Sequence, residues 1–215
     1  MVWRSELNMR CGIWRASGHG NAARARSRQA GVAAVEFAIL AIVFFTLVLS
    51  VIELARAMFV VNTLYEVTRH AANAAAVTSH ADTTALAAIR QRAVFRNAPG
   101  ALLLSAPVSN ESVRFSYFAL PRAGDGTLAL QEIPTASLPT CARRNREICM
   151  ANPNAENCIR FVSASICNEA NQRTCNAVIY RPFLPLISFP LALSKATTIR
   201  AVESFGSMPE GTPCL

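Results

Sequence analysis

The sequence predicts an α+β protein with an N-terminal transmembrane helix, a long amphipathic helix continuing from it, and a small disulfide-stapled β-rich C-terminal domain. Three observations predict this fold class. Residues 32–52 form one apolar run, apolar positions recur every three or four residues after it, and six cysteines follow residue 140. A chain of 215 residues has room for one ordinary domain plus accessory segments.

The composition of the chain argues against several classes of protein. The chain is 52% hydrophobic and 16% charged, which is too apolar for a disordered chain or a typical water-soluble enzyme. The formal charge is +8, but 20 of the 21 basic residues are arginines spread along the chain, and only the first 28 residues concentrate them. We therefore expect no nucleic-acid partner, and we expect part of the chain to lie in lipid.

The apolar run has the length of a membrane span. Of residues 32–52, all but Glu36, Thr46 and Ser50 are apolar, and no polar stripe follows any helix face. A helix of this length spans roughly 31 Å, close to the ~30 Å hydrocarbon layer. Four arginines precede the span within 20 residues and two follow it, so the N-terminus is expected in the cytoplasm and residues 53–215 on the exported side.

Cysteine placement supports export. Only Cys11 precedes the span, and six cysteines follow it. Six cysteines in an oxidising compartment suggest three disulfides, with 15 pairings open. Zinc is the alternative, but the spacing lacks the short turns of zinc sites, so we expect no metal and no cofactor. The disulfide candidates are Cys141, Cys149, Cys158, Cys167, Cys175 and Cys214.

The exported part begins as a helix. The spacing predicts one apolar helix face through Leu54, Met58, Val61, Leu64, Val67 or Thr68, and Ala71. This face is expected to pack on the chain's own C-terminal domain, with packing into a bundle of helices as the alternative. A second helical stretch begins at Asp82 and ends before the turn at Pro99-Gly100.

Strand patterns follow residue 100. Side chains alternate over 113–119, and short β-rich runs lie at 159–166, 177–180 and 197–202. Pro182, Pro185 and Pro190 exclude a central strand and predict an extended loop between the last two runs.

The border of the span carries a motif. A basic leader ends at Gly31, and Glu36 and the aromatic Phe37 lie just inside the apolar run. A carboxylate in lipid needs a partner, and by itself Glu36 could snorkel to the cytoplasmic face and pair with Arg28. The spacing, however, resembles the cleavage site of type IV prepilins and pseudopilins. That resemblance implies that a prepilin peptidase cuts between Gly31 and Val32, and that Glu36 and Phe37 act in recognition and assembly.

A narrower resemblance covers about residues 28–77. The runs 34–38 and 52–56 and the alanine-rich stretch 71–75 are similar to TadE-like pseudopilins of the tight-adherence (Tad/Flp) pilus system. A weaker similarity to the end of TadE- and TadG-like chains lies at 180–185 and 193–203. Phe37 stands where major Flp pilins have tyrosine, which favours a minor component. His70 and Asn73 stand where the family often has basic residues.

The resemblance implies a minor pseudopilin or assembly protein, structural and not an enzyme, in the bacterial inner membrane with a periplasmic domain, and able to enter a surface pilus. Its implied partners are prepilin peptidase, other pilins or pseudopilins, inner-membrane assembly proteins and the membrane, with no small-molecule substrate. The expected organisation is a leader over 1–31, the span over 32–52, a helical stalk over 53–98 and the exported β-rich domain over 99–215.

Two other hypotheses remain open. The chain could be an uncleaved, single-pass periplasmic protein, or signal peptidase could cut at Ala55-Arg56-Ala57 and release a soluble protein. The sequence contains no GxSxG, HExxH, P-loop or CxxC motif, so no catalytic residue is assigned, although a released soluble protein could be an enzyme with unrecognised residues.

Overall fold

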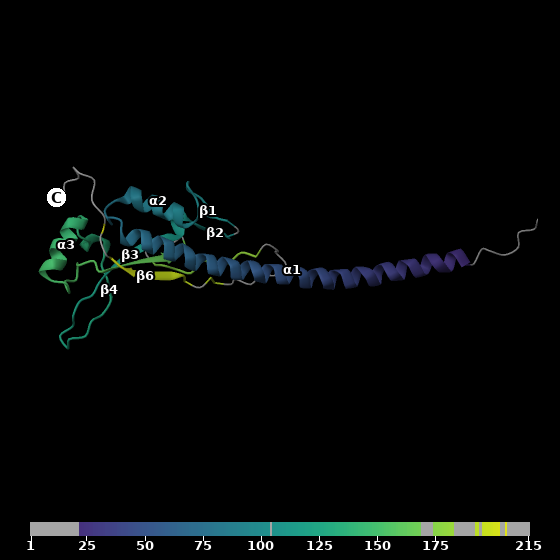
Figure 1. Cartoon of the computed structure of the whole chain (residues 1–215). Helices are drawn as coiled ribbons and strands as arrows, with labels where there is room; N and C mark the ends of the chain where they lie inside the picture. Colours follow the sequence, from purple (N-terminus) through teal and green to yellow (C-terminus); the bar gives the residue numbers. More distant parts are fainter. Residues whose placement is uncertain are drawn as a thin grey trace, which may run out of the picture. The chain divides into compact units, whose positions relative to one another are not determined.

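The computed structural model describes residues 22–103, 105–168, 174–182, 192–193, 195–202 and 205, with only the backbone described for 22–30 and 106. The chain divides into two compact units at Val51 and Ile52, which are described separately. Helices and antiparallel strands are both present, and the expected α+β fold class is confirmed (Figure 1).

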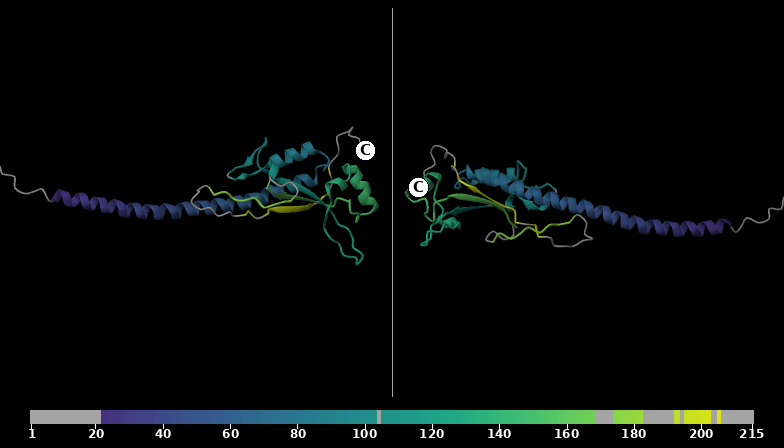
Figure 2. Two further views of the ribbon diagram at one scale, coloured as in Figure 1. Left: turned by 180° about the vertical axis from the view of Figure 1, so that it is seen from behind. Right: turned by 60° about the horizontal axis from the view of Figure 1, so that its bottom comes forward.

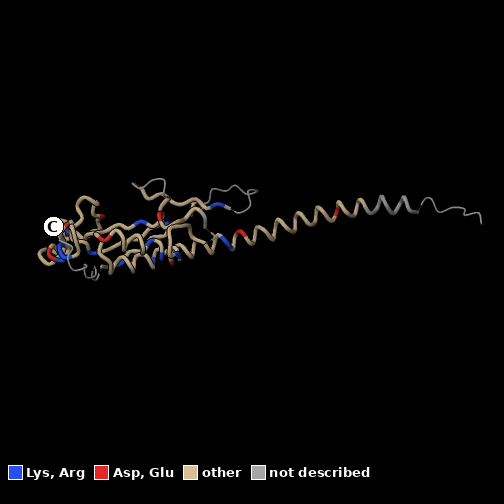
Figure 3. The backbone as a smooth tube through the Cα atoms, turned by 90° about the horizontal axis from the view of Figure 1, so that it is seen from above, with Lys and Arg blue, Asp and Glu red and all other residues tan. Residues whose placement is uncertain are grey.

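Helix α1 runs from Ala22 to Ala76. In the first unit, its large apolar side chains from Val32 onward are exposed, except that Val48 is half-buried. The hydroxyls of Thr46 and Ser50 each donate to the carbonyl four residues earlier, at 2.7 Å, which satisfies them within the helix. Figure 3 shows no charged residue between Glu36 and Glu53. By length and composition, this part of α1 fits a single-pass membrane anchor.

In the second unit, one face of α1 is buried. Leu64, Val67 and Ala71 lie in the core, which confirms the later part of the predicted face, while Val60 is buried in place of the predicted Val61, which is only partly buried. The prediction is wrong for the start of this face, because the side chains of Leu54 and Met58 are 63% and 61% exposed. Three-residue steps turn a helix by about 300°, so a row of them drifts around the helix and leaves the face on which it began.

A four-stranded antiparallel sheet has the order β4-β3-β5-β6, with β3 Val113–Ala119, β4 Gln131–Glu132, β5 Phe161–Ile166 and β6 Thr197–Ala201. The predicted alternation in β3 is confirmed at Val113, Tyr117 and Ala119, which are buried. A separate pair joins β1 Ala101–Leu102 to β2 Ser105–Ser109. The remaining elements are the 3-10 turns η1 Asn110–Ser112 and η2 Thr135–Ser137, and the helix α3 Ala142–Ala151.

The sheet packs against the C-terminal part of α1, with helix α2 (Thr83–Ala93) beside it (Figure 2). Asp82 starts α2 as predicted, because its carboxylate accepts the Ala85 N–H at 2.9 Å and caps the helix. The Thr68 and Thr198 hydroxyls lie 3.0 Å apart and join α1 to β6. The sheet therefore covers the later part of the predicted apolar face of α1, from Leu64 to Ala71.

The predicted strand at 177–180 is wrong, because the segment makes only an isolated bridge between Ile179 and Ala192. The Leu193 N–H donates to the Val178 carbonyl at 2.8 Å, but no longer ladder forms among the described residues. Proline explains the short pairing, since Pro182 has no N–H to extend it. Pro185 and Pro190 lie outside the described residues.

Two disulfides join segments of the second unit among the described residues. Cys149–Cys158 ties α3 to the segment before β5, and Cys167–Cys175 links the residue after β5 to a residue eight positions later. Their Cα separations, 5.1 and 4.8 Å, are ordinary for disulfides. These four cysteines are therefore unavailable as zinc ligands. Cys141 is also disulfide-bonded, and Cys214 lies outside the described residues.

We expect Cys141 to pair with Cys214. The four other described cysteines bond to one another, which leaves Cys11 and Cys214, and Cys11 precedes the membrane segment. Peptide mapping by mass spectrometry without reductant should find one linked peptide that holds Cys141 and Cys214, and this peptide should split on reduction. A free thiol at Cys141 would contradict the assignment.

Candidate functional site

The first candidate site is the stretch of α1 around Gly31. Gly31, Val32, Glu36 and Phe37 are all exposed, and Val32 and Phe37 are 69% and 72% accessible. A Cβ added at Gly31 would meet no atom within 4 Å, and the backbone there is not left-handed. Neither the packing nor the backbone of this chain therefore requires glycine at residue 31.

Glu36 is the one carboxylate in the apolar part of the helix. It makes no hydrogen bond or ion pair with another described residue, and the side chain of Arg28 lies outside the described part of the chain. An exposed carboxylate on an otherwise apolar helix costs free energy in lipid unless a cation neutralises it. The geometry leaves Glu36 open to a group from outside this chain.

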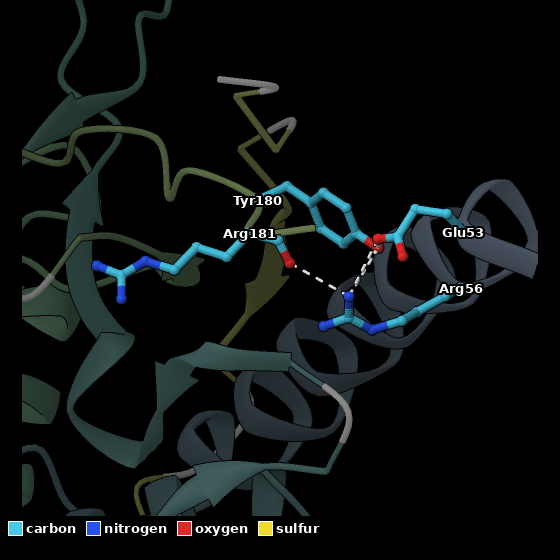
Figure 4. Close-up of polar contacts among 4 residues, drawn as sticks. All are labelled: Glu53, Arg56, Tyr180 and Arg181. Carbon is cyan, nitrogen blue, oxygen red and sulfur yellow. Dashed lines mark hydrogen bonds and ion pairs between the residues drawn. The ribbon is translucent and has the colours of Figure 1, made fainter. Parts of the chain in front are cut away.

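The second candidate site is a polar junction where α1 meets the segment before Pro182; we call Glu53, Arg56 and Tyr180 the junction cluster. The Tyr180 hydroxyl donates to Glu53 Oε1 at 2.6 Å. Arg56 Nη1 lies 3.1 Å from Glu53 Oε1, 3.2 Å from the Tyr180 oxygen and 3.2 Å from the Arg181 carbonyl oxygen (Figure 4). The Arg56 guanidinium also lies over the Tyr180 ring, 5.1 Å from its centroid.

The junction cluster is largely shielded from water. The side chains of Glu53 and Arg56 are 17% and 15% exposed, and Tyr180 is buried. Burial, followed by the hydrogen bond to Glu53, raises the pKa of Tyr180 from 10.0 to about 12. The neutral phenol therefore keeps its proton at physiological pH, and its contribution to stability is lost only as the pH rises from about 10 to 12. At neutral pH the junction cluster is therefore a structural contact that links α1 to the segment before Pro182.

Replacing Tyr180 by phenylalanine should destabilise the folded domain of the second unit by about 1.5 to 3 kcal/mol, the value of a hydrogen bond to a charged group. The ring and its contact with the Arg56 guanidinium remain, so the loss reports the hydroxyl alone. Thermal unfolding of the detergent-solubilised protein at pH 7 measures it.

Tyr117 supplies the matched control. Its hydroxyl is buried without a hydrogen-bond partner among the described residues, and burial raises its pKa to about 12. Tyr117→Phe removes an unsatisfied polar group, so it should leave the melting temperature unchanged or raise it. Equal losses in the two variants would show that the Tyr180 hydroxyl contributes no specific bond.

Sequence reasoning found part of the junction cluster. Glu53 and Arg56, like Glu66 and Arg69, stand three residues apart in the sequence, which makes them neighbours on a helix surface, and their charged groups lie 3.1 and 3.6 Å apart. The contact of Tyr180 with Glu53 was missed, although both residues lie in segments that carry the family resemblance. One sequence offers no local signal for a contact between residues 127 positions apart.

The remaining titratable groups do not form a catalytic or metal centre among the described residues. No group of three or more His, Cys, Asp or Glu side chains there is placed to hold a metal ion. His80 packs edge-on against the rings of Tyr117 and Phe205, and its Nε2 lies 2.6 Å from the Pro139 carbonyl oxygen. Burial lowers the pKa of His80, while the Pro139 contact opposes that shift, so His80 is a neutral core residue.

Comparison with known protein families finds a match within α1. Residues 31–73 match the family described as TadE-like protein. This segment is TadE-like. The TadE-like segment begins at Gly31 and contains Glu36, Phe37, Glu53 and Arg56. No curated protein and no solved structure matches the chain.

Proposed function

We propose that the chain is a minor pseudopilin, a structural and assembly component of a Tad (Flp) pilus and secretion machine. The observation that carries this proposal is the TadE-like segment, which starts at the glycine of the expected cleavage site. Within it, one exposed carboxylate interrupts a helix that fits a membrane anchor. The partners we propose are prepilin peptidase, other pilins or pseudopilins and inner-membrane assembly proteins.

We propose that prepilin peptidase cleaves between Gly31 and Val32. Glycine is not needed there by the fold, and this supports a requirement imposed by an enzyme that must approach the backbone. The new Val32 amine is a cation at the membrane border. The exposed carboxylate of Glu36 in a neighbouring subunit can neutralise it as the helices pack, and Phe37 would contribute to recognition beside it.

The proposed topology places the N-terminus in the cytoplasm and the exported domain in the periplasm, anchored in the inner membrane. The arginines before the apolar segment and the disulfides after it support this orientation. In this organisation the leader is 1–31, the span 32–52, the helical stalk 53–98 and the head 99–215. The stalk and head act as one folded body, because α1 contributes its buried face to the core.

One observation favours a second candidate, an uncleaved membrane-anchored periplasmic protein. Helix α1 begins at Ala22, so the Gly31–Val32 peptide bond lies within a helix. A protease needs that stretch unwound before it can cut. Glycine lowers the cost of unwinding, because it disfavours a helix interior by about 1 kcal/mol relative to alanine.

Deletion of the gene tests the proposed function. Cells without it should lose surface pili and surface adherence, and the wild-type chain supplied from a plasmid should restore both. Electron microscopy counts the pili. Normal piliation in the deletion strain would refute the assembly role.

A further inference from the structure

We propose that the corner formed by residues 179–182 docks on the phospholipid surface and gives the exported domain a second contact with the membrane. The occupant of this surface is the layer of anionic lipid headgroups on the exported side. The inference rests on the membrane anchoring that is part of the proposed function.

The corner lies close to the end of the apolar segment of α1. The Tyr180 hydroxyl bonds Glu53, the first residue after the apolar segment, and the Arg181 carbonyl oxygen accepts from Arg56. At 1.5 Å per residue, Arg56 lies about 6 Å beyond Ile52 along α1. The headgroup layer on each side of a bilayer is roughly 5 to 7 Å thick. The junction cluster therefore holds the corner at headgroup depth.

The corner exposes one apolar and one cationic side chain. Ile179 is 51% exposed, and the exposed side chain of Arg181 makes no ion pair with a described residue. Figure 4 shows that side chain turned away from the Glu53 carboxylate. Leu54, the residue after Glu53 on α1, is also an exposed apolar side chain. An exposed apolar side chain beside an exposed arginine, whose stem can lie along lipid while its charged head reaches the phosphates, suits a membrane interface.

The sequence next to the corner agrees with this placement. Residues 183–191, which follow Pro182, contain six large apolar side chains and no charged residue. A charged segment there would have opposed an approach to lipid. The corner thus lies between a polar joint with α1 and an uncharged stretch of chain, with the Arg181 guanidinium available to a lipid phosphate.

Photo-crosslinking of the full chain in vesicles tests the inference. A benzophenone amino acid in place of Ile179 should form a lipid adduct in vesicles that contain phosphatidylglycerol. The same probe at Arg122, exposed between β3 and β4, is the matched control and should give only background. Arg181→Gln, in a chain with the probe at residue 179, should lower the adduct about fivefold in phosphatidylglycerol and little in phosphatidylcholine, because one cation near an anionic surface is lost.

A probe at Phe44 separates the two possible failures. An adduct at Phe44 with only background at Ile179 would overturn the docking of the corner and leave the membrane anchor intact. Background at Phe44 as well would overturn the anchoring itself. An adduct at Ile179 that is insensitive to Arg181→Gln would overturn the role of the lipid phosphate.

Discussion

Gly31→Leu should leave the chain full length and stop its processing. The leucine side chain would project where a peptidase must reach the backbone, and a 1 Å displacement at a reacting bond can cost roughly 10²-fold in rate. The structure has open space for the side chain, and leucine favours a helix more than glycine by about 0.8 kcal/mol. Loss of processing would therefore not report misfolding. Immunoblots of membrane fractions should show the precursor accumulating.

Val35→Leu is the matched control for that variant. Val35 is exposed on the same helix, four residues from Gly31, and lies away from the scissile bond. It should be processed like the wild-type chain. If Gly31→Leu is also processed normally, glycine is dispensable to the peptidase and the proposed recognition is wrong.

Glu36→Ala should separate processing from assembly. The carboxylate lies five residues from Gly31, so cleavage should largely survive, but a neighbouring Val32 amine would lose its partner on leaving water. Removing one member of a buried ion pair costs about 3 to 5 kcal/mol, which is more than a hundredfold in an assembly equilibrium. Processed protein should remain in the membrane, and pili should be few or absent by electron microscopy.

Two further variants, Glu36→Gln and Thr46→Ala, test whether the charge of Glu36 is the cause of the expected assembly defect. Glutamine keeps the size of the side chain and removes its charge, so it should fail as alanine does. The Thr46 hydroxyl is satisfied within α1, and its loss should leave piliation unchanged. Normal piliation with Glu36→Ala would mean that Glu36 is a snorkelling border residue.

The sequence was sufficient for the elements that leave a continuous local pattern. The membrane segment of α1 was predicted from its long apolar run, β3 from the alternation of its side chains, and β5 and β6 from short β-rich runs. Asp82 marked the start of α2 because a side-chain cap leaves a signal in one residue. Strands β1 and β4 have two residues each, too few for any period to show.

Contacts between residues far apart in the chain could not be predicted from the sequence. The junction cluster depends on Tyr180 reaching Glu53 across 127 residues, and the drift of the apolar face past Met58 depends on where the sheet meets α1. Disulfide pairing had the same limit, since the count of six cysteines leaves the partners open. The site around Gly31 was found only by its resemblance to a family motif, because each residue there alone has an ordinary structural explanation.

The structure also bears on the third hypothesis, cleavage at Ala55-Arg56-Ala57. Arg56 is part of the junction cluster, and a cut there would separate Glu53 from Tyr180. The released domain, residues 58–215, would lose Glu53 and Arg56 together, and the buried Tyr180 hydroxyl would lose its hydrogen-bond partners, which costs about 1 to 3 kcal/mol. The junction cluster thus disfavours release by signal peptidase.

The mass of the mature chain tests the central claim most directly. Protein purified from membranes of piliated cells should begin at Val32, as determined by intact mass and N-terminal sequencing after reduction. A chain that still begins at Met1 in cells with active prepilin peptidase, or one that begins at Met58, would contradict the pseudopilin assignment.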